Sequence, residues 1–287
     1  MDQLTLNKID IEAKVGFRPG RYTNANKTFG FLVATLITVG FFLCLHLLPP
    51  HIQIHRVVDI FLNRGIIPYF LVLGFCWGII LVWVKARKAN AQTKALQFLL
   101  SHHIAGWEFS VTAAQRAKAK LLKLVPSPTD FILTHRLYMA LTSLATLQQP
   151  QAVSGLLTDQ ADADEAQVED SYAFIGTLLY IIPVLGFIGT VLGLGDAIGN
   201  FGATLAGIGG SDLSNMIPSL KGVTGGLALA FDTTLVALVA ALLLQIYASF
   251  VRAHESAFLE DCSLFLQQEV IPKLSMGDLE KSETEQG

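Results

Sequence analysis

Four long apolar stretches constrain this chain more than any other feature of its sequence. They cover residues 29–48, 66–84, 172–195 and 222–251, and together they contain a single formally charged residue, Asp232. Each stretch is long enough to cross a hydrocarbon layer of about 30 Å as an α-helix, which rises about 1.5 Å per residue. Because nearly all of the charge lies elsewhere, we expect an integral membrane protein with a polar portion. This division excludes a plain soluble enzyme.

The lysine and arginine residues predict how the chain is oriented. Residues 1–28, 85–171 and 252–287 contain 17 of the 20 basic residues, whereas the connections at 49–65 and 196–221 contain three. Short cytoplasmic segments of membrane proteins carry an excess of lysine and arginine. We therefore expect both termini and the long middle segment in the cytoplasm, with the two short loops on the opposite, periplasmic side. The polar start of the chain predicts no secretory signal.

The sequence thus predicts an all-α membrane protein divided into five parts. These are a cytoplasmic N-terminal segment (1–28), two outer transmembrane helices with a short loop (29–84), a cytoplasmic helical region (85–171), two pore-side transmembrane helices (172–251), and a cytoplasmic helix with a disordered tail (252–287). The fourth span is expected to continue as that last helix, because several apolar residues beyond Arg252 share one helical face. They are Phe258, Leu259, Cys262, Phe265 and Leu266.

Two segments of the cytoplasmic region allow more than one interpretation. Residues 130–148 are apolar enough for a fifth span, but His135 and Arg136 near their middle favour an amphipathic cytoplasmic helix that starts at Asp130 as its N-cap. Residues 159–170 contain six carboxylates. We interpret this run as a solvated helix face, with binding of a partner as the alternative.

Small residues distinguish the last two spans from the first two. The first two spans are rich in bulky side chains that suit contact with lipid, whereas 13 of the 24 glycines lie within residues 172–226. Small residues let membrane helices approach closely. The candidate packing residues are Gly186, Gly189, Gly193 and Ala197 on the third span, and Ala230, Ala237 and Ala241 on the fourth. We therefore expect spans three and four to be inner helices and spans one and two to be outer ones.

Polar side chains within these inner spans are the candidates for an ion pathway. Thr190 lies on the glycine stripe of the third span, and Thr234 lies on the alanine stripe of the fourth. Asp232 and Thr233 immediately precede Thr234, and ionisable groups inside a membrane are costly and usually functional. Because Asp232 projects about 200° away from Thr234 on a helix, we expect it to face a neighbouring helix or subunit. A structural hydrogen bond and a second protonatable station both remain open for it.

Two motifs resemble the pore helices of the MotA/TolQ/ExbB proton-channel family. The first is "LGFIGTVLGL" (185–194), which resembles the family's L-x-G-L-x-G-T-V-x-G-x pattern. The second is "ALAFDTTLVALVAAL" (228–242), in which Ala237 replaces the usual glycine and Asp232 and Thr233 are additions. Four spans with both termini in the cytoplasm resemble the MotA layout, whereas the sequences of the pore helices are more similar to those of ExbB and TolQ.

The resemblance implies a specific assembly and activity. Such subunits form a ring, usually a pentamer, in the bacterial inner membrane, around a partner dimer of the single-span ExbD, TolR or MotB type that brings an essential aspartate. Thr190 and Thr234 match the two pore threonines of the family, which would offer hydroxyls to that aspartate and to the passing ion. The chain would then be a stator subunit that couples proton or sodium flow to work such as import, envelope maintenance, protein transport or motility.

Two other functions are considered beside the ion channel. A non-conducting membrane scaffold could use the same small-residue packing, although the polar stripe argues against it. A solute transporter would be expected to show internal repeats, and the two pairs of spans share no pattern. No motif for catalysis, a metal site or a cofactor is apparent, and a net charge of −3 indicates no nucleic-acid partner.

Overall fold

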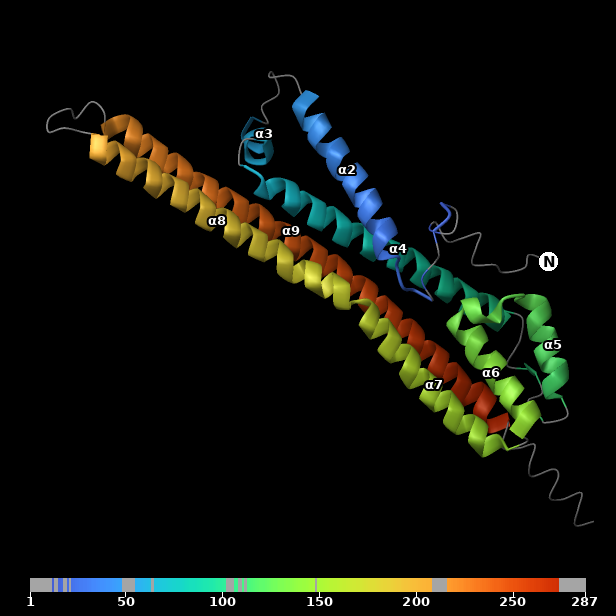
Figure 1. The fold of residues 1–287 in the computed structure, drawn as a ribbon. Coiled ribbons are helices and arrows are strands. Elements are labelled where there is room, and N and C mark those ends of the chain that lie inside the picture. The colour runs from blue at the N-terminus through green and yellow to red at the C-terminus, as the bar shows by residue number, and fades with distance from the viewer. Residues whose placement is uncertain are drawn as a thin grey trace, which may run out of the picture. The chain divides into compact units, whose positions relative to one another are not determined.

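The computed structural model describes residues 12, 15–17, 20, 22–47, 55–62, 65–101, 106–107, 110, 113–147, 149–207 and 216–273. These residues are helical or lie in turns and connections, and none of them forms a strand (Figure 1). Within this described part of the chain, four helices are long and apolar enough to cross a membrane, judged by length and composition: Lys27–Leu47, Ile67–Ser101, Gln151–Gly202 and Lys221–Lys273. The all-helical fold with four candidate spans is therefore confirmed.

The helices follow one another along the chain with short connections. In order they are α2 (Lys27–Leu47), α3 (His55–Leu62), α4 (Ile67–Ser101), α5 (Ala114–Leu124), the 3₁₀ turn η3 (Pro128–Asp130), α6 (Ile132–Leu147), α7 (Pro150–Ser171), α8 (Ala173–Gly207), α9 (Met216–Phe265) and the π-helical turn η5 (Leu266–Val270). The sequence did not predict α3, which lies in the expected loop at 49–65. Pro183 lies inside α8 without ending the helix.

The chain divides into two compact units, and the long helices contribute to both. We call residues Lys27–Val82 and Phe174–Ala248 the span unit. Residues Met1–Asn26, Trp83–Ala173 and Ser249–Gly287 form the bundle unit. The span unit thus contains most of the apolar sequence, and the bundle unit contains most of the polar sequence.

Within the span unit, α8 and α9 lie side by side along their length (Figure 1). Glycines on α8 and α9 bring them this close: a Cβ atom on Gly226 would stand 2.5 Å from Ala197 Cβ and 3.1 Å from Gly193 O. Glycine also lets α4 approach its neighbours, because a Cβ atom on Gly78 would collide with Leu244. The absence of a side chain at Gly226 and Gly78 therefore allows these helices to approach closely.

Many large apolar side chains of α8 and α9 remain exposed. Large exposed side chains on α8 and α9 include Tyr180, Phe187, Val191, Leu192, Ile198, Phe231, Leu235, Leu238, Leu242 and Phe250. Membrane-spanning surface of this kind contacts lipid or other helices. A single copy of the chain therefore leaves room for further helices against α8 and α9.

In the bundle unit, α6 lies between α5 and α7 (Figure 1). The helix α5 buries its apolar face, Ala114, Ala117 and Leu121, and exposes Arg116, Lys120 and Lys123. The helix α6 begins at Ile132 and not at Asp130, because the preceding residues form η3. The N–H of Ile132 is instead satisfied by Gln92 Oε1 of α4, at 3.1 Å.

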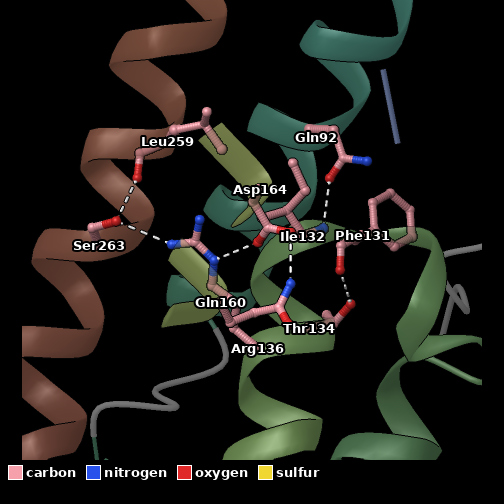
Figure 2. Close-up of polar contacts among 9 residues, drawn as sticks. All are labelled: Gln92, Phe131, Ile132, Thr134, Arg136, Gln160, Asp164, Leu259 and Ser263. Carbon is pink, nitrogen blue, oxygen red and sulfur yellow. Dashed lines mark hydrogen bonds and ion pairs between the residues drawn. The ribbon is translucent and has the colours of Figure 1, made fainter. Parts of the chain in front are cut away.

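A buried ion pair joins three helices of the bundle unit (Figure 2). Arg136 of α6 donates from Nε to Asp164 Oδ2 of α7 at 2.8 Å and from Nη1 to Ser263 Oγ of α9 at 3.0 Å. Gln160 Nε2 donates to the other carboxylate oxygen of Asp164 at 2.8 Å. Both charged side chains are 1% exposed. The interpretation of the acidic run as a solvated face is therefore wrong for Asp164, which points into the bundle.

The last part of α9 packs as its sequence predicts. The side chains expected on one face are all buried: Phe258, Leu259, Cys262, Phe265 and Leu266. The same helix contains the fourth span, so the predicted continuation is confirmed. The tail predicted to be disordered, residues 275–287, lies outside the described residues.

Candidate functional site

Two threonines face each other where α8 packs on α9. The hydroxyl oxygens of Thr190 and Thr234 are hydrogen-bonded to each other. Thr190 Oγ1 also lies 3.1 Å from Ala230 O on α9 and 3.3 Å from Gly186 O on its own helix. Thr234 Oγ1 lies 3.0 Å from Gly186 O on α8 and 3.3 Å from Ala230 O on its own helix. We call these two hydroxyls and two carbonyls the threonine pair.

The hydroxyl protons of the threonine pair have a choice of acceptors. Each hydroxyl donates one proton and accepts through two lone pairs. A third hydroxyl, of Thr233, also donates to Ala230 O, at 3.0 Å. Three hydroxyls therefore converge on one carbonyl that the α-helix already uses for its own hydrogen bond. Several donor–acceptor arrangements fit the same heavy-atom positions. Each hydroxyl can therefore switch its proton from one acceptor to another by rotating about its C–O bond.

The small residues predicted for packing surround the threonine pair. A Cβ atom on Gly186 would overlap the methyl group of Ala237 and stand 3.2 Å from Thr234 Cα. A Cβ atom on Gly189 would stand 2.7 Å from Thr233 Oγ1. Larger residues at these glycines would push the helices apart and break the contact between the hydroxyls. The polar contact is therefore possible because Gly186 and Gly189, which lie beside it, have no side chain.

The remaining predicted residues occupy different positions around the pair. Gly193, Ala197 and Ala230 are buried like Gly186, whereas Ala241 is half-buried. Thr233 is 2% exposed. Asp232 is half-buried, and within the described residues neither hydroxyl of the threonine pair contacts its carboxylate.

The hydroxyls of the threonine pair can donate and accept hydrogen bonds, and they do not titrate near neutral pH. Its two half-buried hydroxyls offer both donors and acceptors, which a hydronium ion, a sodium ion or a carboxylate can use in place of water. In hydrocarbon, a polar group without a partner costs several kcal/mol, on the order of 2–7 kcal/mol for a hydroxyl. The arrangement keeps both hydroxyls satisfied and leaves them able to rearrange, which suits a passing ion.

Other candidate sites fit a ligand less well. Among the described residues, no group of three histidine, cysteine or carboxylate side chains could hold a metal ion. A cavity of about 430 Å³ opens between α7 and α9 in the bundle unit, next to η5. Its lining includes Arg136, which is bound to Asp164, and the exposed carboxylates of Asp162, Glu165 and Glu260. These opposite charges do not select one ligand.

Sequence reasoning found the two hydroxyls but missed the carbonyls of Gly186 and Ala230. Every residue carries a main-chain carbonyl, so residue types do not reveal which carbonyls accept hydrogen bonds from side chains. A signal did exist, because a threonine four residues after a glycine or alanine can reach the carbonyl of that residue on its own helix. Thr190 follows Gly186 at this spacing, and Thr234 follows Ala230. The contacts across the two helices depend on their register and could not be inferred.

Comparison with known proteins identifies part of the chain. Residues 127–262 match the model of the MotA/TolQ/ExbB proton channel family. The match covers α6, α7, α8 and most of α9, and therefore includes the whole threonine pair. No curated protein and no solved structure matches the chain.

Proposed function

We propose that this chain, which belongs to the MotA/TolQ/ExbB proton channel family through residues 127–262, is an ion-channel subunit of an energy-transducing complex of the bacterial inner membrane. Several copies form a ring, a pentamer by analogy with the family, with α8 and α9 innermost and both termini in the cytoplasm. Protons or sodium ions pass between this ring and a partner of the single-span ExbD, TolR or MotB type. The chain is a stator subunit and not an enzyme.

The threonine pair carries this proposal. Its hydroxyls share the carbonyls of Gly186 and Ala230, so each can rotate toward an ion or a partner carboxylate and still keep an acceptor. Because threonine does not titrate, the pathway needs a protonatable group from elsewhere, and the family implies an aspartate on the partner for this role. The hydroxyls then solvate the ion as it moves to or from that carboxylate.

Uncovered apolar surface supports the ring. Exposed large side chains on α8 and α9 would meet α8 and α9 of neighbouring copies on one side and the partner helices on the other. Membrane helices associate through close van der Waals packing and interhelical hydrogen bonds. The glycines and alanines within one copy leave the bulkier side chains free for these contacts.

The test replaces both hydroxyls and measures ion flux. Thr190→Val combined with Thr234→Val preserves side-chain shape but removes both hydroxyls. Hydrogen bonds between membrane helices contribute about 0.6 kcal/mol on average, so we expect the ring to assemble. Flux through proteoliposomes that contain the partner should fall about ten- to a hundredfold, because a hydrogen bond to a charged group is worth about 1.5–3 kcal/mol.

The matched control is Thr35→Val. Thr35 lies in α2, and its hydroxyl donates only to Phe31 O of its own helix, at 2.9 Å. This variant should conduct normally. If the double variant at Thr190 and Thr234 conducts as well as Thr35→Val, the threonines only pack, and a non-conducting scaffold becomes the better account.

Asp232 is a separate part of the proposal. We propose that it stabilises a contact between helices or subunits, because it is half-buried and lies apart from the threonine pair. Asp232→Asn keeps the shape of the side chain but cannot titrate. We expect normal assembly and normal flux. Normal assembly with lost flux would instead make Asp232 a second protonatable station of the pathway.

A further inference from the structure

Three polar side chains meet inside the bundle unit, each close in sequence to a point where the chain enters or leaves that unit. Lys85 follows Trp83 on α4, Tyr172 precedes Ala173 between α7 and α8, and Glu255 follows Ser249 on α9. Their exposed fractions are 1%, 7% and 2%, respectively. Burying a lysine and a glutamate is costly even when they are paired. A cluster of this kind therefore needs an explanation other than stability alone.

The helix is interrupted at Tyr172. The helix α7 ends at Ser171 and α8 begins at Ala173, while Tyr172 between them forms a turn. Its N–H bonds to Glu169 O at 3.0 Å, which is the tighter spacing of a 3₁₀ turn. Tightened turns of this kind often mark positions where a long helix can bend. We call Ser171 and Tyr172 the α7–α8 junction.

Both side chains of the α7–α8 junction are held by charged groups from other helices. Lys85 Nζ donates to Ser171 Oγ at 2.6 Å and forms an ion pair with Glu255 Oε1 at 3.3 Å. Tyr172 Oη donates to Glu255 Oε2 at 2.5 Å. The ammonium group of Lys85 also lies 4.2 Å from the centre of the Tyr172 ring. One ion pair between α4 and α9 thus binds both residues of the α7–α8 junction.

A second, exposed ion pair encloses the same tyrosine. Arg252 of α9 bonds to Glu169 of α7, and its guanidinium carbon lies 5.8 Å from the centre of the Tyr172 ring. Burial lowers the pKa of Lys85, and the carboxylate of Glu255 opposes that shift. Hydrophobic residues of similar volume commonly stabilise a protein as well as a buried ion pair does. Hydrogen bonds are directional and apolar contacts are not, so the cluster can favour one geometry of the junction.

We propose that the Lys85–Glu255 ion pair is a latch that fixes the α7–α8 junction, and that Lys85 and Glu255 act as positioning residues for α8, the helix that carries Thr190. This proposal rests on the proposed function, because it assigns the latch a role in ion conduction. The latch holds Ser171 and Tyr172 through two hydrogen bonds, one from Lys85 to Ser171 and one from Tyr172 to Glu255. Loss of the latch frees the junction to bend.

The first experiment removes single atoms of the latch. Tyr172→Phe removes only the hydroxyl, and Glu255→Gln removes only the charge. Tyr138→Phe is the matched control, because the Tyr138 ring also lies near a cation, Lys118 at 4.7 Å. Hydrogen exchange of the full-length protein then reports on each helix. We expect exchange at the junction to accelerate about ten- to a hundredfold in both latch variants, with α5 and α6 unchanged.

The second readout is ion flux with the partner present. Flux should fall several-fold in Tyr172→Phe and Glu255→Gln and stay normal in Tyr138→Phe. Lys85→Arg keeps the positive charge and should retain both slow exchange at the junction and most of the flux. A merely structural role would not produce this combination of local exchange, lost flux and rescue by a like charge.

Each contrary result overturns a defined part of the proposal. Unchanged exchange at the junction in both latch variants would refute the latch. Faster exchange throughout the bundle unit would make the cluster an ordinary stabilising core. Faster exchange at the junction with normal flux would remove the positioning role. If the unaltered protein conducts no ions with its partner, the proposed function fails, while hydrogen exchange still decides whether the latch exists.

Discussion

Removing one member of the buried pair Arg136–Asp164 should destabilise the protein far more than removing both. Asp164→Leu leaves the guanidinium of Arg136 at 1% exposure with Ser263 as its remaining partner. Breaking a buried ion pair in this way costs about 3–5 kcal/mol. Because typical proteins are stable by about 5–15 kcal/mol, this single change removes a large part of the folding free energy. At roughly 2–4 °C per kcal/mol for chains of this size, the midpoint of thermal unfolding should fall by about 10 °C.

The double variant Arg136→Met with Asp164→Leu should recover most of this loss. It removes both buried charges and fills the space with apolar atoms, and such replacements are often neutral or stabilising. Thermal unfolding of the purified protein in detergent gives the free energies for a double-mutant cycle. The pair Lys273–Glu269, which is only partly buried and has Nζ and Oε2 3.2 Å apart, serves as control. Its removal should change stability by less than about 1 kcal/mol. Additive effects of Arg136→Met and Asp164→Leu would refute the reasoning.

Three further predictions concern helix packing, thiol chemistry and assembly. Gly186→Ala should lower the free energy of unfolding by about 1–3 kcal/mol, because its Cβ atom meets Ala237 and Thr234 where α8 packs on α9. Gly176→Ala has open space around the new Cβ atom and should not lower it, which thermal unfolding of both variants can test. Burial raises the pKa of Cys262 to about 12, so at pH 8 only about one thiol in ten thousand is the reactive thiolate, and maleimide labelling followed by mass spectrometry should modify Cys262 only after unfolding. Native mass spectrometry should detect a ring of several copies, with cross-links between cysteines introduced on α8 or α9 of neighbouring copies; cross-links that bring α4 to the central axis would reject this arrangement.

The four spans could be predicted because their composition leaves no alternative. Residues 29–48 correspond to α2, Lys27–Leu47, almost to the residue. The lower boundary of the second span agrees as well, since α4 begins at Ile67. Long uncharged runs with many bulky residues can satisfy their main chain in lipid only as helices. The end of α4 at Ser101 could not be predicted from hydropathy, because the helix continues beyond the apolar stretch into ordinary polar sequence.

Residue types alone do not predict the buried charges, because a charged residue in a polar segment normally faces water. Spacing nevertheless contained a signal for Asp164. It lies seven residues after Leu157 and four before Val168, both buried, so it shares the apolar face of α7. Arg136 likewise interrupts an otherwise apolar helix. Their pairing required the positions of α6 and α7, which the sequence alone does not provide.

The threonine pair shows the same limit at the candidate site. Spacing places Thr190 beside Gly186 and Thr234 beside Ala230 on two small-residue stripes. The hydrogen bond between the hydroxyls, and the crossing of each hydroxyl to the opposite carbonyl, follow from the register of α8 against α9. That register is set by contacts such as Gly186 with Ala237. Many registers of two small-residue helices fit the sequence equally well.

Ion flux with and without the partner tests the central claim most directly. The chain is reconstituted into liposomes alone, and also together with a single-span partner that carries an aspartate in its span. A pH-sensitive dye inside the vesicles, or a sodium-sensitive one, then follows flux under an imposed membrane potential. The account predicts flux of one of these ions in the complex and none through the chain alone. An assembled complex that passes neither protons nor sodium ions would contradict it.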